Sequence, residues 1–90
     1  IPPQFELTRD TVPEFNRWIE AASAAEWVVA DAEYHDHKSL TILGLGYPGM
    51  AKGCQLIWPK LTFDLKSIVE EAVWRLATTT TFVFQNSIGA

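Results

Sequence analysis

Hydrophobic residues recur at helical spacing in two segments of the chain. In the first, over residues 11–24, Thr11 and Glu14 have the spacing of a capping box, which satisfies free amides at a helix start. Apolar positions then recur every three or four residues, as on the buried face of an amphipathic helix. The residues expected on this face are Val12, Phe15, Trp18, Ile19 and Ala22.

The second helical segment begins at Asp64, a residue type that often caps helix N-termini. Phe63 before it and Ile68 after it have the spacing of a hydrophobic staple, which fixes how the chain enters a helix. The pattern therefore predicts a second amphipathic helix. Its apolar stripe consists of Leu65, Ile68, Val69, Ala72, Val73 and Leu76.

Alternation of apolar and polar positions predicts the strands. The opening IPPQFELT indicates an edge strand with Phe5 and Leu7 on one side, because proline is tolerated at sheet edges. A hairpin is expected over residues 27–45, followed by a strand in CQLIW and a last strand in TTTTFVFQ. In the first hairpin strand, Val28, Ala30, Ala32 and Tyr34 face one side, and Asp31, Glu33 and His35 face the other.

These elements predict a single α+β domain spanning residues 1–90, in which two helices pack on one face of a mainly antiparallel sheet. The expected order is βαββ(β)αβ. It becomes the ferredoxin-like βαββαβ order if the glycine-rich loop only interrupts one long strand. If the terminal strands are peripheral, it becomes an αβββα variant.

The chain has a formal net charge of −4, and its 7 Lys and Arg residues are scattered along it. Nucleic acids and anionic membranes both attract clustered basic residues, so we expect neither as a partner. The single cysteine, Cys54, cannot form an internal disulfide, which favours an intracellular (cytoplasmic) location and a packing role for the thiol. The chain begins with Ile1 and not with Met, as expected of a processed or trimmed protein.

The segment TILGLGYPGMAKG places Gly44, Gly46 and Gly49 in the GxGxxG spacing of a dinucleotide-binding loop. That motif needs a helix directly after it, because the helix N-terminus holds the pyrophosphate. Only three residues follow before the next glycine, so we expect a turn between two strands and no cofactor. An exposed apolar tip of this loop would consist of Tyr47, Pro48 and Met50.

The segment DAEYHDH contains a candidate metal site. At two-residue spacing, Asp31, Glu33, His35 and His37 could line one face of a strand, about 6.6 Å apart. A His-x-His pair with nearby carboxylates can ligate zinc or a similar ion. The pattern is also that of a half-buried strand that shows its polar residues to water, and His37 already falls in the expected turn, so we favour this interpretation over a metal site.

Two tryptophans fall outside the expected core. Trp74 lies opposite the apolar stripe of the second helix, beside Glu70 and Glu71, and Trp27 shares the strand face of the acidic residues. Because tryptophan is enriched in interface hot spots, these positions favour partner binding.

We therefore expect a small non-catalytic interaction domain or assembly subunit that binds itself or another protein. The residues expected to bind the partner are Trp74, Glu70, Glu71, Tyr47, Pro48, Met50 and Trp27. The alternative is a small metal-binding protein or metal-dependent enzyme that uses the His-x-His site.

Overall fold

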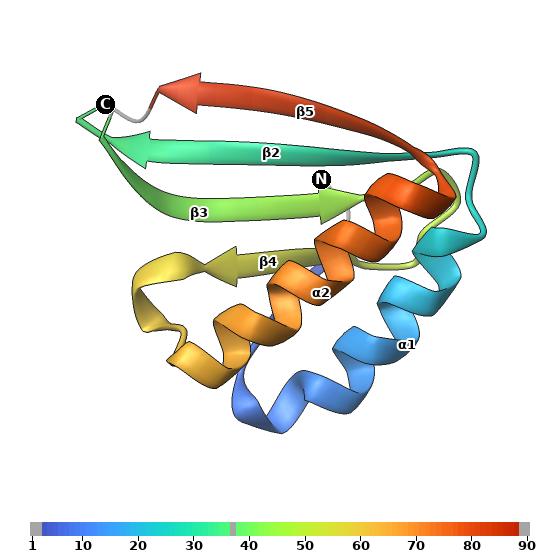
Figure 1. The fold of residues 1–90 in the computed structure, drawn as a ribbon, viewed down its shortest axis with the longest axis horizontal. Helices are drawn as coiled ribbons and strands as arrows, with labels where there is room; N and C mark the ends of the chain where they lie inside the picture. The colour runs from blue at the N-terminus through green and yellow to red at the C-terminus, as the bar shows by residue number, and fades with distance from the viewer. Residues whose placement is uncertain (1–2, 37, 89–90) are drawn as a thin grey trace.

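The computed structural model describes residues 3–36 and 38–88 (Figure 1). Short 3-10 turns precede α1 and α2, over Arg9–Thr11 and Trp58–Lys60. The strands and helices are, in chain order, β1 (Gln4–Glu6), α1 (Val12–Ser23), β2 (Trp27–His35), β3 (Ser39–Gly46), β4 (Gly53–Ile57), α2 (Phe63–Thr79) and β5 (Thr81–Ile88).

The five strands form one mixed sheet in the order β1-β4-β3-β2-β5. β3 pairs antiparallel with β2 and β4, whereas β1 pairs in parallel with β4, and β5 pairs in parallel with β2. The predicted α+β class is confirmed. The sheet is mixed and not mainly antiparallel, because each helix connects two strands that run in the same direction.

The two predicted variants of the element order along the chain do not describe this structure. The glycine-rich loop separates two complete strands, β3 and β4, so the chain does not reduce to the four-strand ferredoxin-like order. β1 and β5 are the two edge strands and each is paired within the sheet, so the αβββα variant, which leaves them out, does not apply either.

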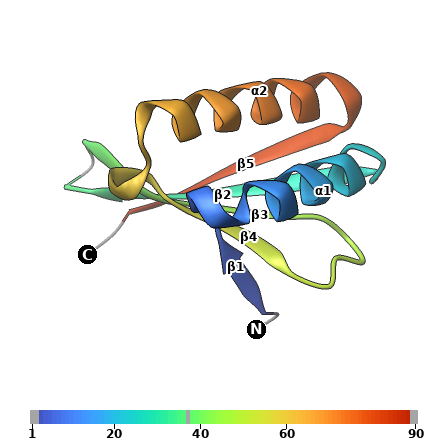
Figure 2. The ribbon, with the colours of Figure 1, turned by 90° about the horizontal axis from the view of Figure 1, so that it is seen from below.

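Both helices lie on the same face of the sheet (Figures 1 and 2). The connection from β1 to β2 and the connection from β4 to β5 each cross two intervening strands in the same direction along the sheet. Connections between parallel strands are almost always right-handed. Two right-handed crossovers in the same direction must place α1 and α2 on the same side.

The core lies between this helical layer and the sheet. The predicted faces of α1 and of β2 are confirmed by burial, and half-buried Ile68 and Val73 flank the buried positions of α2. The largest fully buried side chains are Phe15, Leu7, Leu56, Leu76, Val28, Val69 and Cys54.

Among the described residues, no helix is long and apolar enough to cross a membrane.

Both predicted helix starts differ in detail. The Thr11 hydroxyl accepts a hydrogen bond from the Thr8 N–H at 2.8 Å and lies 2.7 Å from the Glu6 carbonyl, so it caps the preceding 3-10 turn and not α1. Thr62, one residue before α2, caps that helix by accepting from the backbone N–H of Leu65 at 3.4 Å. Phe63 is 83% exposed, so the predicted hydrophobic staple is not formed.

Candidate functional site on the open face of the sheet

The face of the sheet opposite the helices has no second layer over it in the described part of the chain (Figure 2). The side chains of β2 alternate between the core under the helices and the open face, because successive residues of a strand point to opposite faces. Val28, Ala30 and Ala32 are completely buried under the helices. On the open face, Trp27, Asp31 and Glu33 are exposed and Val29 is half-buried.

A hollow of about 310 Å³ lies on this open face. In the antiparallel register, Gly44 of β3 lies beside Asp31, and Gly46 lies beside Val29. A Cβ built on Gly44 would meet only the Asp31 backbone oxygen, at 3.8 Å, so the floor of the hollow is open at this point. The residues that line the hollow are Gln4, Trp27, Val29, Asp31, Gly44, Leu45, Gly46, Tyr47 and Met50.

The loop between β3 and β4 forms one wall of the hollow. Gly49 has a φ of 85°, and the Met50 N–H donates to the Tyr47 carbonyl oxygen at 3.3 Å. Proline before this glycine matches the residue preference of a type II turn. The next element is β4 and not a helix, so the predicted turn between two strands is confirmed.

The side chains of this loop fold back onto the domain. The Tyr47 ring meets the Trp18 ring edge to face, with 5.0 Å between centroids. The Trp18 indole nitrogen donates to the Lys52 carbonyl at 2.6 Å, which ties the loop to α1. Tyr47 and Met50 are half-buried, so of the predicted apolar tip only Pro48 is exposed.

The four residues of the candidate metal site are not brought together. Asp31 and Glu33 lie on the open face, both exposed. His35 is at the end of β2, where its imidazole lies 3.0 Å from the Asp36 carboxylate, and His37 lies outside the described residues. In the part of the chain that the structure describes, no three His, Cys, Asp or Glu side chains form a group that could hold a metal ion.

The residues predicted to bind a partner fall on two sides of the molecule. Trp74 is 74% exposed on α2, where Glu70 and Glu71 are also exposed. Trp27 is 41% exposed on the opposite, helix-free face. A single flat partner therefore cannot contact both tryptophans, and the predicted set divides into two candidate surfaces.

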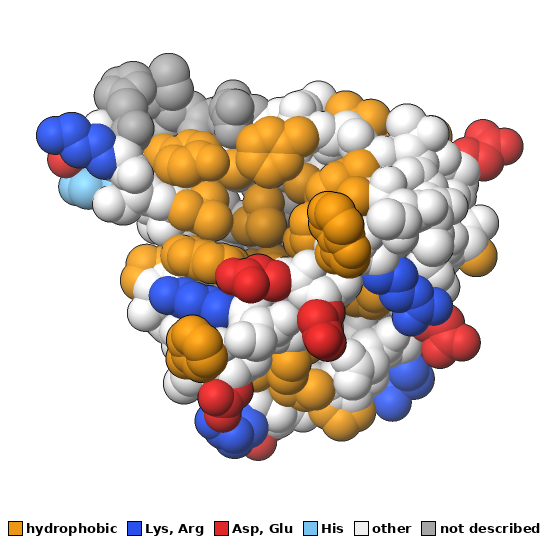
Figure 3. All heavy atoms as spheres, viewed as in Figure 1, with side chains coloured by type: hydrophobic (Ala, Val, Ile, Leu, Met, Phe, Trp, Pro, Cys, Tyr) orange, Lys and Arg blue, Asp and Glu red, His pale blue; other side chains and the backbone are white. Residues whose placement is uncertain are grey.

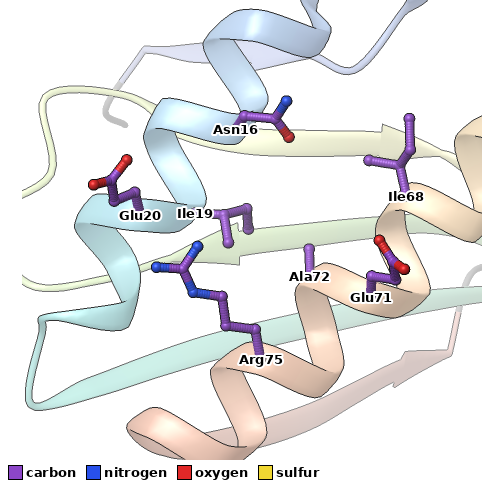
Figure 4. Close-up of a pocket in the computed structure, with 7 residues that line it drawn as sticks. All are labelled: Asn16, Ile19, Glu20, Ile68, Glu71, Ala72 and Arg75. Carbon is purple, nitrogen blue, oxygen red and sulfur yellow. The ribbon is translucent and has the colours of Figure 1, made fainter.

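A groove of about 400 Å³ runs between the two helices (Figure 4). The Arg75 side chain extends from α2 toward α1 (Figure 4) and donates to the Ser23 hydroxyl at 3.3 Å. Polar and charged side chains from both helices border this groove, and the carboxylates of Glu20 and Glu71 are among them. The groove is therefore less apolar than the hollow on the open face.

Cys54 is completely buried in β4, facing the helices. Burial and, to a smaller extent, the negative charge of Glu14 together raise the pKa of its thiol to about 12. A buried, protonated thiol is a poor nucleophile, so the predicted packing role agrees with the structure.

Comparison of the chain with protein-family models, curated proteins and solved structures finds no match.

Sequence reasoning missed the role of the glycines and of the last strand. The sequence predicts that Gly44 and Gly46 belong to a turn between two strands, whereas both lie within β3, where their two-residue spacing places them on one face. The parallel pairing of β5 with β2, which places Gln85 beside Asp31, has no local signal in the sequence.

The pKa of Cys54 predicts a pH dependence of stability. The unfolded chain releases the thiol proton near the usual pKa of 9.0, whereas the folded protein keeps it up to about 12. The free energy of unfolding should therefore fall as the pH rises above about 9, by up to about 1.4 kcal/mol per pH unit. Urea unfolding of the wild type and Cys54→Ala between neutral and alkaline pH measures this effect. The wild-type stability minus that of the variant should decrease with pH, and a constant difference would contradict the assignment.

Proposed function

We propose that the open face of the sheet binds a divalent cation together with a phosphate ester that carries a planar ring, and that the chain catalyses hydrolysis of that ester. The observation that carries this proposal is the position of Asp31 and Glu33. They lie on the same exposed face of β2, and Asp31 also lines the hollow, where it is paired with Gly44.

The two carboxylates suit a hard cation such as Mg²⁺. Successive side chains on one strand face are about 6.6 Å apart, which lets two acidic side chains lean toward one ion. Mg²⁺ is commonly held by only one or two carboxylates and by phosphate oxygens of the substrate. A third protein ligand is therefore not required. When bound, such an ion neutralises phosphate charge and activates water for attack on phosphorus.

The residues that line the hollow favour a ligand that carries a planar ring. Gly44 has no side chain above the sheet, so a ligand can approach the backbone there. Trp27 and Tyr47 contribute aromatic side chains to the lining. Stacking of a base on an aromatic ring contributes about 1–3 kcal/mol in proteins that bind single strands. A nucleotide carries both a planar base, which can stack on these side chains, and a phosphate.

The acidic charge of the chain limits which nucleotides fit. With a net charge of −4 and no basic cluster, the protein lacks the phosphate-neutralising surface that long nucleic acids require. A cation between Asp31 and Glu33 would supply positive charge at one point only. The proposed ligand is therefore a single nucleotide or the end of one strand.

Hydrolysis of the p-nitrophenyl ester of thymidine 5′-monophosphate tests this function. Water adds to phosphorus and p-nitrophenol leaves, which absorbance records. We expect the release of p-nitrophenol to depend on Mg²⁺ or Mn²⁺. Asp31→Asn or Glu33→Gln should lower the rate of release on the order of a hundredfold, since each removes a charge near the reacting phosphate. Glu70→Gln and Glu71→Gln are matched controls, because they remove the same charge on the helical side. Activity that survives both changes on β2, or that persists in EDTA, would refute the proposal.

A second candidate function is favoured by Trp74. It is a non-catalytic interaction domain or assembly subunit that uses the helical side of the molecule. The side chain of Trp74 is 74% exposed between Glu70 and Arg75, so it contributes little to the core. A large exposed ring of this kind is typical of an interface hot spot.

Replacement of this ring tests the second candidate. Trp74→Ala should weaken self-association, measured by sedimentation, by about tenfold or more, because hot-spot side chains contribute at least about 2 kcal/mol. Its urea unfolding curve should stay unchanged. Phe63→Ala is the control, since Phe63 is exposed at the opposite end of α2. Equal association of wild type and Trp74→Ala would exclude Trp74 as the contact.

A further inference from the structure

β5 is an unprotected edge of the sheet. It is 8 residues long and, within residues 3–36 and 38–88, pairs only with β2. Natural edge strands are usually short or carry charged residues, proline or a bulge, which prevent pairing with another chain. Residues 76–90 contain neither a charged residue nor a proline. β1 at the other edge is protected, because it is 3 residues long, follows two prolines and ends in Glu6.

The backbone of β5 presents hydrogen-bonding groups on its outer side. The Thr81 N–H donates toward β2, to the Glu26 carbonyl at 3.4 Å, and Thr81 faces Trp27 in the parallel register. Successive residues of a strand direct their peptide groups to opposite sides. Phe82 and Phe84 therefore direct their N–H and C=O groups away from β2.

The side chains at this edge are apolar on both faces. Val83 is 39% exposed on the helix-free face, and Phe84 is 53% exposed on the helical side. Hydrophobic side chains gather on the helical side along β5 and the adjoining part of α2 (Figure 3). Exposed, uncharged and apolar edge strands favour pairing with another strand.

We propose that a second copy of this chain pairs antiparallel along β5, about a two-fold axis at Val83. In this register Phe82 of each copy lies opposite Phe84 of the other, and their outward N–H and C=O groups bond to one another. The edge is self-complementary, as a two-fold interface requires. The sheets of the two copies join into one sheet of ten strands, twice the 5 of one copy.

The charge distribution favours a second copy over an acidic or basic partner. Each copy has a net charge of −4, so two copies repel at most surfaces. Residues 76–90 carry none of this charge, and antiparallel pairing places uncharged residues opposite each other. A basic partner would find no carboxylate along this edge.

This inference rests on the second candidate function and is independent of cation binding. Sedimentation velocity over a hundredfold range of protein concentration tests it. We expect a dimer in the wild type, and a dimer dissociation constant raised at least about tenfold in Phe84→Lys, because the variant places a charge at the centre of the interface. Phe63→Lys is the matched control. It makes the same change of charge at an exposed phenylalanine distant from β5, and it should remain dimeric.

Different results are expected if the β5 interface alone is wrong and if the protein does not associate with itself at all. A monomer at every concentration overturns both the β5 interface and self-association. Association that Trp74→Ala weakens and Phe84→Lys leaves unchanged overturns the β5 interface alone. Circular dichroism and urea unfolding show whether Phe84→Lys is folded. If it is not, Val83→Lys, which places the charge on the helix-free face at the two-fold axis, should dissociate the dimer.

Discussion

The handedness of the two crossover connections determines how this domain is organised. β1 and β2 run parallel, as do β4 and β5, and each pair is joined across two intervening strands in the same direction. Right-handed connections then place both helices on one face. The buried apolar side chains of α1 and α2 pack there, and the other face of the sheet has no helix to cover it in the described chain.

Several side chains have positions that packing in the core does not explain, and these side chains lie on or beside the uncovered face of the sheet. β2 alternates between completely buried Ala30 and exposed Asp31, so one strand serves both the core and the candidate site. Glycines in β3 leave the floor beside Asp31 open, while the turn after β3 holds Tyr47 against Trp18. A rigid sheet thus positions the carboxylates, and a tied loop positions the aromatic wall. Sites held by regular elements keep their geometry more closely than sites on loops.

Much of the fold followed from local patterns, and the site followed only in part. The stripe from Phe15 to Ala22 and the alternation from Val28 to Tyr34 correctly identified buried faces, because each pattern reports its own local period. Strand order did not follow, since β1 and β5 pair with strands that are distant in sequence. The sequence predicts Asp31 and Glu33 only as two of the four candidate ligands of the His-x-His site. The neighbours of Asp31 in the sheet, Gly44 and Gln85, became apparent only through the register of three strands. Capping by Thr62 in place of Asp64 shows that a favourable residue type two positions away can take the same role.

The central claim is that the helix-free face carries the functional site, with a cation at Asp31 and Glu33. The most direct test is paramagnetic broadening of backbone amide NMR signals by substoichiometric Mn²⁺. Broadening should be strongest at Asp31 and Glu33 and should extend to Gly44 and Gln85, which flank Asp31 in the sheet. Strongest broadening at Glu70 and Glu71, or equal broadening across all exposed carboxylates, would contradict the account.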